Sequence, residues 1–301
     1  MSEYTLVVLH KTDHSFAFYD VTTGERLDEI KTRPFPHEIC LSPDHKKMYI
    51  AEMGVRGVES TGPGGHTIAV YDTNSHELLR TIDTGKYDRP HGLAAANGRL
   101  FVTSESTKHL LIYDLNSKEL LHAVFLDQDC AHMVNVAPDG KQAYTANIFS
   151  NTITEVDVES GQVLKHIDVL ERPEGLVFSP DGKLIYVVNR ESYAVSIVDR
   201  QLGRQIDTIV MGNGPVRVVI APDGRTLVVP LFHSAAVQLV DTRTRQVAQT
   251  VKVGPHPAGT AMSPDGQYAF ISCEDESLIY VFSMQPFEII RTISTGPGCD
   301  A

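Results

Sequence analysis

The chain has 301 residues, of which 42% are hydrophobic, and its 26 basic and 38 acidic residues give a formal net charge of −12. This negative charge opposes binding to a phosphate backbone, so we expect no nucleic-acid partner. No apolar run approaches the length needed to cross a bilayer, so we expect no membrane partner either.

The first residues lack the features of an export signal. The stretch MSEYTLVVLH has no basic region, and its apolar part is shorter than the core of a signal peptide. The four cysteines have no CxxC spacing, which favours neither a disulfide framework nor a zinc knuckle (Cys40, Cys130, Cys273 and Cys299). We therefore expect a cytoplasmic protein. The sequence carries no signal of its oligomeric state.

A turn motif recurs along the chain at a constant interval. Proline presets φ and glycine accepts a positive φ, so Pro-Asp-Gly between two apolar runs predicts a tight turn. Four copies stand 42 residues apart, at 137–140, 179–182, 221–224 and 263–266. Ser42-Pro43-Asp44 is a weaker early copy, and Asn97-Gly98 predicts the same kind of turn in a shorter hairpin.

Each turn is followed by short strands rather than by helices. An alternating stretch such as 184–189 comes first, a second such as 194–199 ends in Asp, and a third ends near glycine. The Asp that ends this second strand recurs in six repeats, as Asp20, Asp72, Asp114, Asp157, Asp199 and Asp241. Ser283 takes its place in the seventh repeat. Seven copies of about 42 residues predict an all-β fold, a seven-bladed β-propeller that forms a single domain over residues 1–301.

The repeat resembles the YVTN family of propeller repeats. Its clearest copy combines Pro173-Glu174-Gly175, Ser179-Pro180-Asp181-Gly182, Tyr186-Val187-Val188-Asn189 and the strand from Val195 to Asp199. The resemblance covers the whole chain and implies a lactonase-like, seven-bladed propeller. It implies no single activity, because the family resembles enzymes, lactonase-like proteins, electron-transfer subunits and scaffolds alike.

The chain departs from the repeat at two places. Ten extra residues lengthen the first complete blade, where they predict a long Gly-rich loop at 53–66 that we expect to gate access. The last residue, Ala301, falls where the inner strand of the seventh blade should begin. Because residues 4–30 supply the rest of that blade, we expect one blade to be shared between the termini. Its innermost strand is expected to be very short or missing.

The register of the repeat predicts which side chains meet at one mouth of the channel. The innermost strand of each blade lines the channel, and antiparallel pairing places the start of that strand beside the end of the next. The first ring holds the residue after the turn into each innermost strand: His37, His91, His132, Glu174, Val216, Ala258 and Asp300. The second ring holds the residue that ends the next strand: His10, Glu52, Ser104, Asn147, Asn189, Leu231 and Cys273.

Four consecutive positions of the first ring carry metal-ligand side chains. We expect His37, His91, His132 and Glu174 to hold a divalent transition metal, with Fe, Mn or Zn as candidates. Four ligands in an open mouth would leave room for water or substrate. A structural reading stays open, in which each imidazole only hydrogen-bonds a neighbouring blade.

Other polar residues near this mouth are candidates for catalysis. His10 or Glu52 would move a proton, and Arg190 or Arg217 would orient an anionic group of the substrate. For each arginine, a solvated surface position is the alternative.

The residues lead to one main hypothesis and two alternatives. The main hypothesis is a metal-dependent enzyme of the hydrolase, lyase or isomerase type, in which the metal acts as a Lewis acid on a small anionic or carbonyl-containing metabolite. The first alternative is a non-catalytic propeller that binds a ligand or another protein. The second is a metal-free lactonase or cycloisomerase, in which His and Arg side chains act directly.

Overall fold

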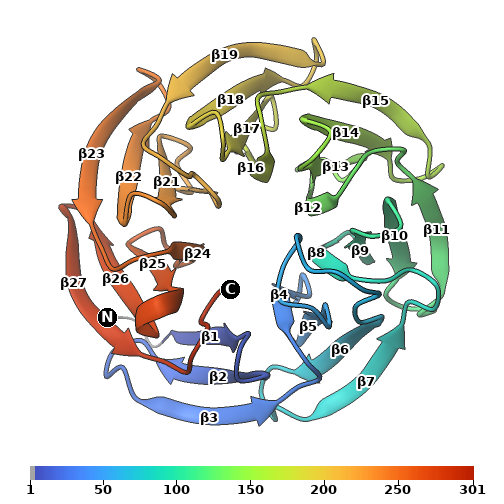
Figure 1. The fold of residues 1–301 in the computed structure, drawn as a ribbon, viewed down its shortest axis with the longest axis horizontal. Helices are drawn as coiled ribbons and strands as arrows, with labels where there is room; N and C mark the ends of the chain where they lie inside the picture. The colour runs from blue at the N-terminus through green and yellow to red at the C-terminus, as the bar shows by residue number, and fades with distance from the viewer. Residues whose placement is uncertain (1–3) are drawn as a thin grey trace.

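The computed structural model describes residues 4–301, which form seven antiparallel sheets arranged as blades around a central axis (Figure 1). Consecutive strands are neighbours within each sheet, so every blade is a simple meander. The prediction of a seven-bladed β-propeller with an all-β fold is confirmed. Among the described residues, no helix has the length and apolar character that spanning a bilayer requires.

The strands of the first three complete blades follow chain order. Blade 1 holds β4 (Pro36–Leu41), β5 (Lys47–Glu52), β6 (Thr67–Asp72) and β7 (Leu78–Asp83). Blade 2 holds β8 (Pro90–Ala96), β9 (Arg99–Ser104), β10 (His109–Asp114) and β11 (Leu120–Phe125). Blade 3 holds β12 (Ala131–Val136), β13 (Gln142–Asn147), β14 (Thr152–Asp157) and β15 (Val163–Asp168).

The remaining blades continue the same order. Blade 4 holds β16 (Pro173–Phe178), β17 (Leu184–Asn189), β18 (Ala194–Asp199) and β19 (Arg204–Val210). Blade 5 holds β20 (Val219–Ile220), β21 (Thr226–Leu231), β22 (Ala236–Asp241) and β23 (Gln246–Lys252). Blade 6 holds β24 (Pro257–Met262), β25 (Tyr268–Cys273), β26 (Leu278–Met284) and β27 (Phe287–Ser294), with the short helix η1 (Glu274–Glu276) after β25. Blade 7 holds β1 (Thr5–His10), β2 (Ser15–Asp20) and β3 (Arg26–Lys31).

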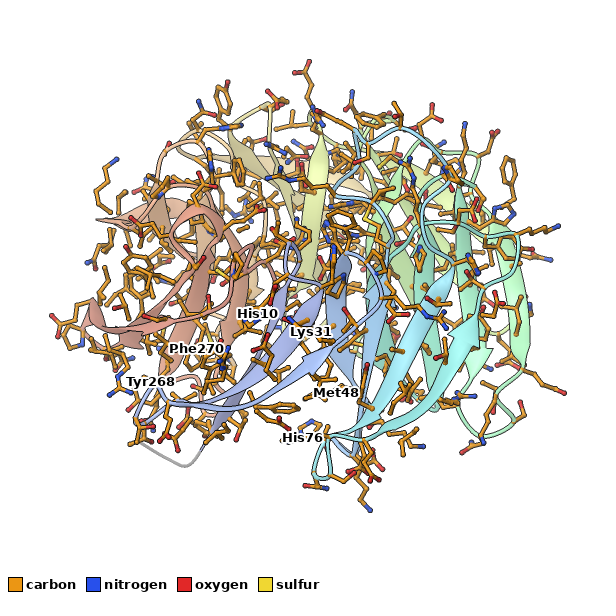
Figure 2. The ribbon with its side chains drawn as sticks, turned by 60° about the horizontal axis from the view of Figure 1, so that its bottom comes forward. His10, Lys31, Met48, His76, Tyr268 and Phe270 are labelled. Atoms are coloured by element: carbon orange, nitrogen blue, oxygen red, sulfur yellow. The ribbon has the colours of Figure 1, made fainter. Side chains whose placement is uncertain are left out.

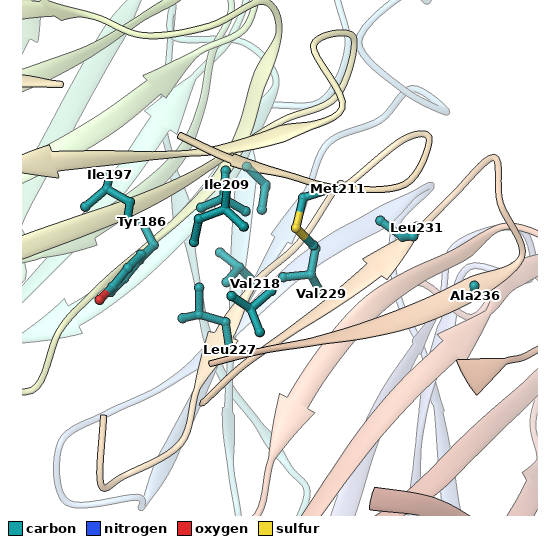
Figure 3. Packing of buried hydrophobic residues seen from close by; sticks show 12 residues of the cluster. Tyr186, Ile197, Ile209, Met211, Val218, Leu227, Val229, Leu231 and Ala236 are labelled. Carbon is teal, nitrogen blue, oxygen red and sulfur yellow. The ribbon is translucent and has the colours of Figure 1, made fainter. Parts of the chain in front are cut away.

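The place of a strand within its blade explains its composition. Middle strands such as β17 are buried almost throughout, because neighbouring blades pack on both faces. Outer strands such as β3 are mostly exposed and carry charged residues. Between blades 4 and 5, Tyr186 and Ile197 lie in one apolar cluster with Leu227 and Val229 (Figure 3). Burial of such side chains between blades is the main source of stability.

The repeated proline and glycine belong to a contact between successive blades. Gly224 has φ +73°, and a Cβ atom there would lie 2.8 Å from Pro180 Cδ of the preceding turn. Gly182 and Gly266 lie against Pro138 and Pro222 in the same way. The turn therefore needs glycine both for its backbone conformation and for space, which explains why the motif recurs at a constant interval.

The C-terminal residues close the ring. Leu9 N donates to Ala301 O (2.7 Å), Lys11 N donates to Gly298 O (2.9 Å), and Asp300 N donates to Leu9 O (3.2 Å). Residues 298–301 thus pair with β1 as a short innermost strand of blade 7. The prediction of one blade shared between the two ends of the chain is confirmed, and this segment fills the place that the repeat left open.

Candidate functional site

The four predicted ligands lie side by side at one mouth of the channel. Each is the second residue of an innermost strand, and all four are buried (His37, His91, His132 and Glu174). The ring centroids of His37 and His91 are 4.2 Å apart, and those of His91 and His132 are 3.9 Å apart. His132 Nε2 lies 3.3 Å from Glu174 Oε2. The structure thus brings the four together, and their role as metal ligands stays a prediction.

His132 lies between two buried carboxylates. Its Nδ1 hydrogen-bonds Glu105 Oε1 at 2.8 Å, while its Nε2 faces Glu174. Burial alone would lower the pKa of His132, but the hydrogen bonds to Glu105 and Glu174 outweigh burial and raise it to about 8. Burial would raise the pKa of Glu174, but His132, Arg190 and Arg217 lower it to about 2. At neutral pH the two side chains are therefore an imidazolium and a carboxylate.

His91 is the least satisfied polar group of the site. Its side chain is 0% exposed, and neither ring nitrogen has a hydrogen-bond partner. Burial, followed by the charges of His132 and His37, holds the pKa of His91 well below its ordinary value, so the imidazole is neutral. A buried neutral imidazole with two free nitrogens has lost its hydration without compensation.

The last member of the first ring, Asp300, comes from the C-terminal segment. Its Oδ2 accepts a hydrogen bond from Lys11 Nζ at 2.6 Å and lies 3.7 Å from His37 Nε2. Burial would raise the pKa of Asp300, but Lys11, His37 and Arg217 hold it far below its ordinary range. Closure of the ring therefore also completes the charged wall of the mouth.

Both predicted arginines line the mouth, and each is paired with a carboxylate. Arg190 Nη1 donates to Glu174 Oε1 at 3.2 Å, and its guanidinium lies 5.0 Å from the ring centroid of Phe232. Arg217 Nη2 donates to Glu38 Oε1. Neither arginine is a freely solvated side chain, because the side chains of Arg190 and Arg217 are only 22% and 13% exposed.

The two second-ring residues predicted to act in catalysis, His10 and Glu52, make their contacts away from the mouth cavity. His10 contacts Ser15 Oγ at 3.1 Å and Tyr19 Oη at 3.2 Å, and lies in blade 7 close to Lys31 (Figure 2). Glu52 accepts hydrogen bonds from Thr67 Oγ1 and from a backbone N–H. Neither side chain lines the mouth cavity. The assignment of His10 and Glu52 to proton transfer stays a prediction that these contacts do not support.

A third register supplies functional residues that sequence reasoning missed. The residue directly after each second-ring position is Lys11, Met53, Glu105, Ile148, Arg190, Phe232 or Glu274. Of these, Lys11, Phe232 and Glu274 line the mouth cavity beside the predicted Arg190, and Glu105 orients His132. The sequence contained this pattern, because the last four positions are 42 residues apart. Apart from Arg190, the prediction covered only the residue before each of these positions.

These side chains surround a cavity of about 360 Å³ at the mouth. The loop at 53–66 contributes Arg56, Gly57, Val58 and Glu59 to its wall. Arg89 anchors the loop by hydrogen bonds, since its Nη2 donates to the carbonyl oxygens of Ser60 and Gly62 at 2.6 and 2.5 Å. Gating by this loop stays a prediction.

A second cavity of about 480 Å³ lies along the channel below the charged groups. Its walls combine hydrophobic residues such as Leu93, Leu176 and Phe270 with polar residues such as Glu38 and Asn135. Arg217 and Asp300 line both cavities, so these two charged side chains lie where the mouth cavity and the second cavity meet.

Within residues 4–301, three groups of His, Asp and Glu side chains have possible metal-ligand atoms that lie within 4.8 Å of one another. They are His37–Glu38–His91, His91–Glu105–His132 and His10–Asp13–Glu29. Glu174 belongs to none of them. The first two share His91, so the structure concentrates metal-binding capacity around that residue rather than evenly over the four predicted ligands.

Residues 119–205 match the family described as "Lactonase, 7-bladed beta-propeller". This stretch contains His132, Glu174 and Arg190. Antigen Lp49 of Leptospira interrogans serogroup Icterohaemorrhagiae serovar copenhageni is 24% identical over 157 residues, which are 50% of this chain and 34% of that protein. The matched region thus spans about a third of the curated relative.

Several solved structures share the whole fold. The Pseudomonas aeruginosa periplasmic gluconolactonase superposes with a TM-score of 0.82 at 18% identity, covering 100% of this chain and 98% of that one. A putative 6-phosphogluconolactonase from Bacteroides uniformis gives 0.82 at 19% identity, with 100% and 99% covered. Kuenenia stuttgartiensis hydrazine synthase gives 0.79 at 19% identity, with 93% and 92% covered. The chain is a seven-bladed β-propeller that resembles the lactonase propellers.

Proposed function

We propose that this protein is a hydrolase that opens a small cyclic ester in the mouth cavity. One observation carries the proposal: a buried imidazole, His132, is held between two carboxylates at the wall of a cavity large enough for a small metabolite. The partial match to a lactonase family, over a stretch that includes this imidazole, supports the same reaction class.

The residues support a complete proton path for ester hydrolysis. Glu105 holds Nδ1–H of His132, so that Nε2 faces Glu174 and the cavity. A pKa of about 8 makes neutral His132 the minor form at pH 7, and this form takes a proton from water as the water oxygen bonds to the ester carbonyl carbon. The imidazolium then returns this proton to the ring oxygen as the ester C–O bond breaks. The product is an open hydroxy acid, with no other reactant needed.

The arginines suit the charge that develops in this reaction. Arg190 and Arg217 line the same cavity as His132, and each forms an ion pair with one carboxylate. A guanidinium in a partly buried wall stabilises the negative oxygen of the transition state, or an anionic group on the substrate. The side chain of Phe232 offers an apolar face beside Arg190.

A metal-dependent form of the same hydrolysis is the second candidate. It is favoured by His91, whose two unpartnered nitrogens lie beside Glu105 and His132. In that form the metal would polarise the carbonyl or lower the pKa of bound water. His132 would then be a ligand instead of the proton carrier, so a chelator would abolish hydrolysis.

The test offers the protein a panel of five- and six-membered lactones. Hydrolysis is measured by the release of acid, with and without a chelator. Hydrolysis that survives the chelator supports the direct role of His132, and hydrolysis that needs metal supports the second candidate. His122→Gln, on the outer strand β11, is the matched control and should keep full activity. If the folded protein, with and without added Zn²⁺, opens no lactone, the hydrolase proposal is wrong and a binding propeller becomes the better explanation.

A further inference from the structure

We propose that His91, Glu105 and His132 form a binding site for one divalent transition metal ion. The site adds a metal centre to the proposed hydrolysis but does not depend on that reaction. It also differs from the set that the repeat predicts, because Glu105 replaces Glu174 and His37 is left out.

The first argument is the concentration of unsatisfied polar atoms. Among buried atoms without a hydrogen-bond partner are both ring nitrogens of His91 and Glu105 Oε2. Buried polar groups in proteins are almost always satisfied, so unpaired atoms on two adjacent side chains call for a specific explanation. A cation bound by these atoms would satisfy them together.

The second argument is the donor set. Two imidazoles and one carboxylate are the ligands of catalytic zinc sites and of non-haem iron(II) sites, which keep positions open for water or substrate. The ligand atoms of His91, Glu105 and His132 lie within 4.8 Å of one another. Tetrahedral coordination with bonds of about 2.1 Å needs ligand atoms roughly 3.4 Å apart. A closure of at most about 1.4 Å, within reach of side-chain rotation, is therefore enough.

The third argument is electrostatic and excludes the neighbouring group. Glu38 of the His37–Glu38–His91 group is already bound by Arg217, and Lys11 Nζ lies 3.4 Å from His37 Nε2. A metal ion bound there would be repelled by the positive charges of Arg217 and Lys11. Among the described residues, the hydrogen-bond and ion-pair contacts of the Glu105 carboxylate are with His132 at 2.8 Å and His91 at 3.8 Å.

The third ligand-type group serves as an internal control. In His10–Asp13–Glu29, the Lys31 ammonium lies 2.7 Å from Asp13 Oδ2 and 3.3 Å from Glu29 Oε1. A lysine thus already supplies the positive charge that a metal ion would bring. We expect no metal at this group.

The experiment measures metal binding without turnover. The full chain, purified without a histidine tag and stripped with a chelator, is titrated with Zn²⁺ by calorimetry and with Co²⁺ by visible absorption. We expect one ion per chain and ligand-field bands typical of mixed nitrogen and oxygen coordination. His91→Gln and Glu105→Gln should each weaken binding at least tenfold, while Asp13→Asn and His122→Gln should leave it unchanged.

Two outcomes would overturn the site: a stripped wild-type protein that takes up no stoichiometric metal, or unchanged affinity in folded His91→Gln and Glu105→Gln variants. If these variants do not fold, the wild-type Co²⁺ spectrum decides, because a spectrum without imidazole coordination contradicts the proposal. Lactone hydrolysis by the metal-free protein is measured separately. Failure of the metal site is therefore distinguishable from failure of the hydrolase proposal.

Discussion

Arg217 and Glu38 form a buried ion pair that joins blade 5 to blade 1 across the channel, although 179 positions separate them in the sequence. Burial would raise the pKa of Glu38, but the charge of Arg217 outweighs it and lowers the pKa. The pair is therefore ionised, and its Arg217 lines both cavities.

Removing one partner of this pair should cost more than removing both. Glu38→Gln leaves the Arg217 charge buried and unpaired, so we expect the free energy of unfolding to fall by about 3 kcal/mol. The double variant Glu38→Gln/Arg217→Met should recover much of that loss. Urea unfolding of the single and double variants measures the coupling. Additive losses would contradict a direct interaction.

Glu105→Gln tests the orientation of His132. Loss of the carboxylate removes the group that holds Nδ1–H, so we expect kcat for the lactone identified in the panel to fall about 100-fold with little change in KM. Steady-state kinetics with the chelator present isolates this effect from metal loss. An equal fall in kcat for Glu155→Gln, on β14 and outside the cavity lining, would indicate a non-specific effect.

Arg190→Met tests whether the cavity recognises an anionic group. Arg190 is the only guanidinium within contact of both Glu174 and Phe232 among the described residues. We expect KM to rise about tenfold for a lactone that carries a carboxylate, and to change little for its neutral methyl ester. Equal effects on the two substrates would assign Arg190 to positioning Glu174 instead.

Asp300→Asn should make the stability of the closed ring less dependent on pH in the acidic range. The folded-state pKa of Asp300 is lowered, so its contribution is fully present above the unfolded pKa of about 4 and is lost as pH falls toward the folded value. The wild type should therefore be more stable than Asp300→Asn at pH 7, and the difference should shrink below pH 4. Thermal unfolding at several pH values measures it, and a constant difference would contradict the assignment.

Arg89→Met should loosen the loop at 53–66. The buried guanidinium satisfies two loop carbonyl groups, whereas the ion pair between Arg172 and the 75% exposed Glu59 is screened by solvent. We expect limited proteolysis within the loop to speed up several-fold in Arg89→Met and to remain near the wild-type rate in Glu59→Gln. Similar rates in all three proteins would show that Arg89 does not hold the loop.

The sequence by itself determined the architecture and one ring of the site. The constant interval coincides with a contact between blades, because three of the four Pro-Asp-Gly glycines pack against the proline of the preceding turn, as Gly224 does against Pro180. Where this contact fixes the 42-residue interval, residues 42 positions apart take equivalent places in neighbouring blades. For that reason Glu174 could be placed beside His132 from the sequence, while the proline before His37 and before His91 assigned these two residues to the same ring.

Only the tertiary structure decided which atoms meet. The repeat assigns a residue to a position on a strand, but the direction of its side chain depends on what packs around it. His10 turns into blade 7 toward Ser15 and Tyr19, while Glu105, one residue beyond the second ring, reaches His132. The partners of buried charges come from distant blades, so pairs such as Arg217 and Glu38 exist only once the ring has closed.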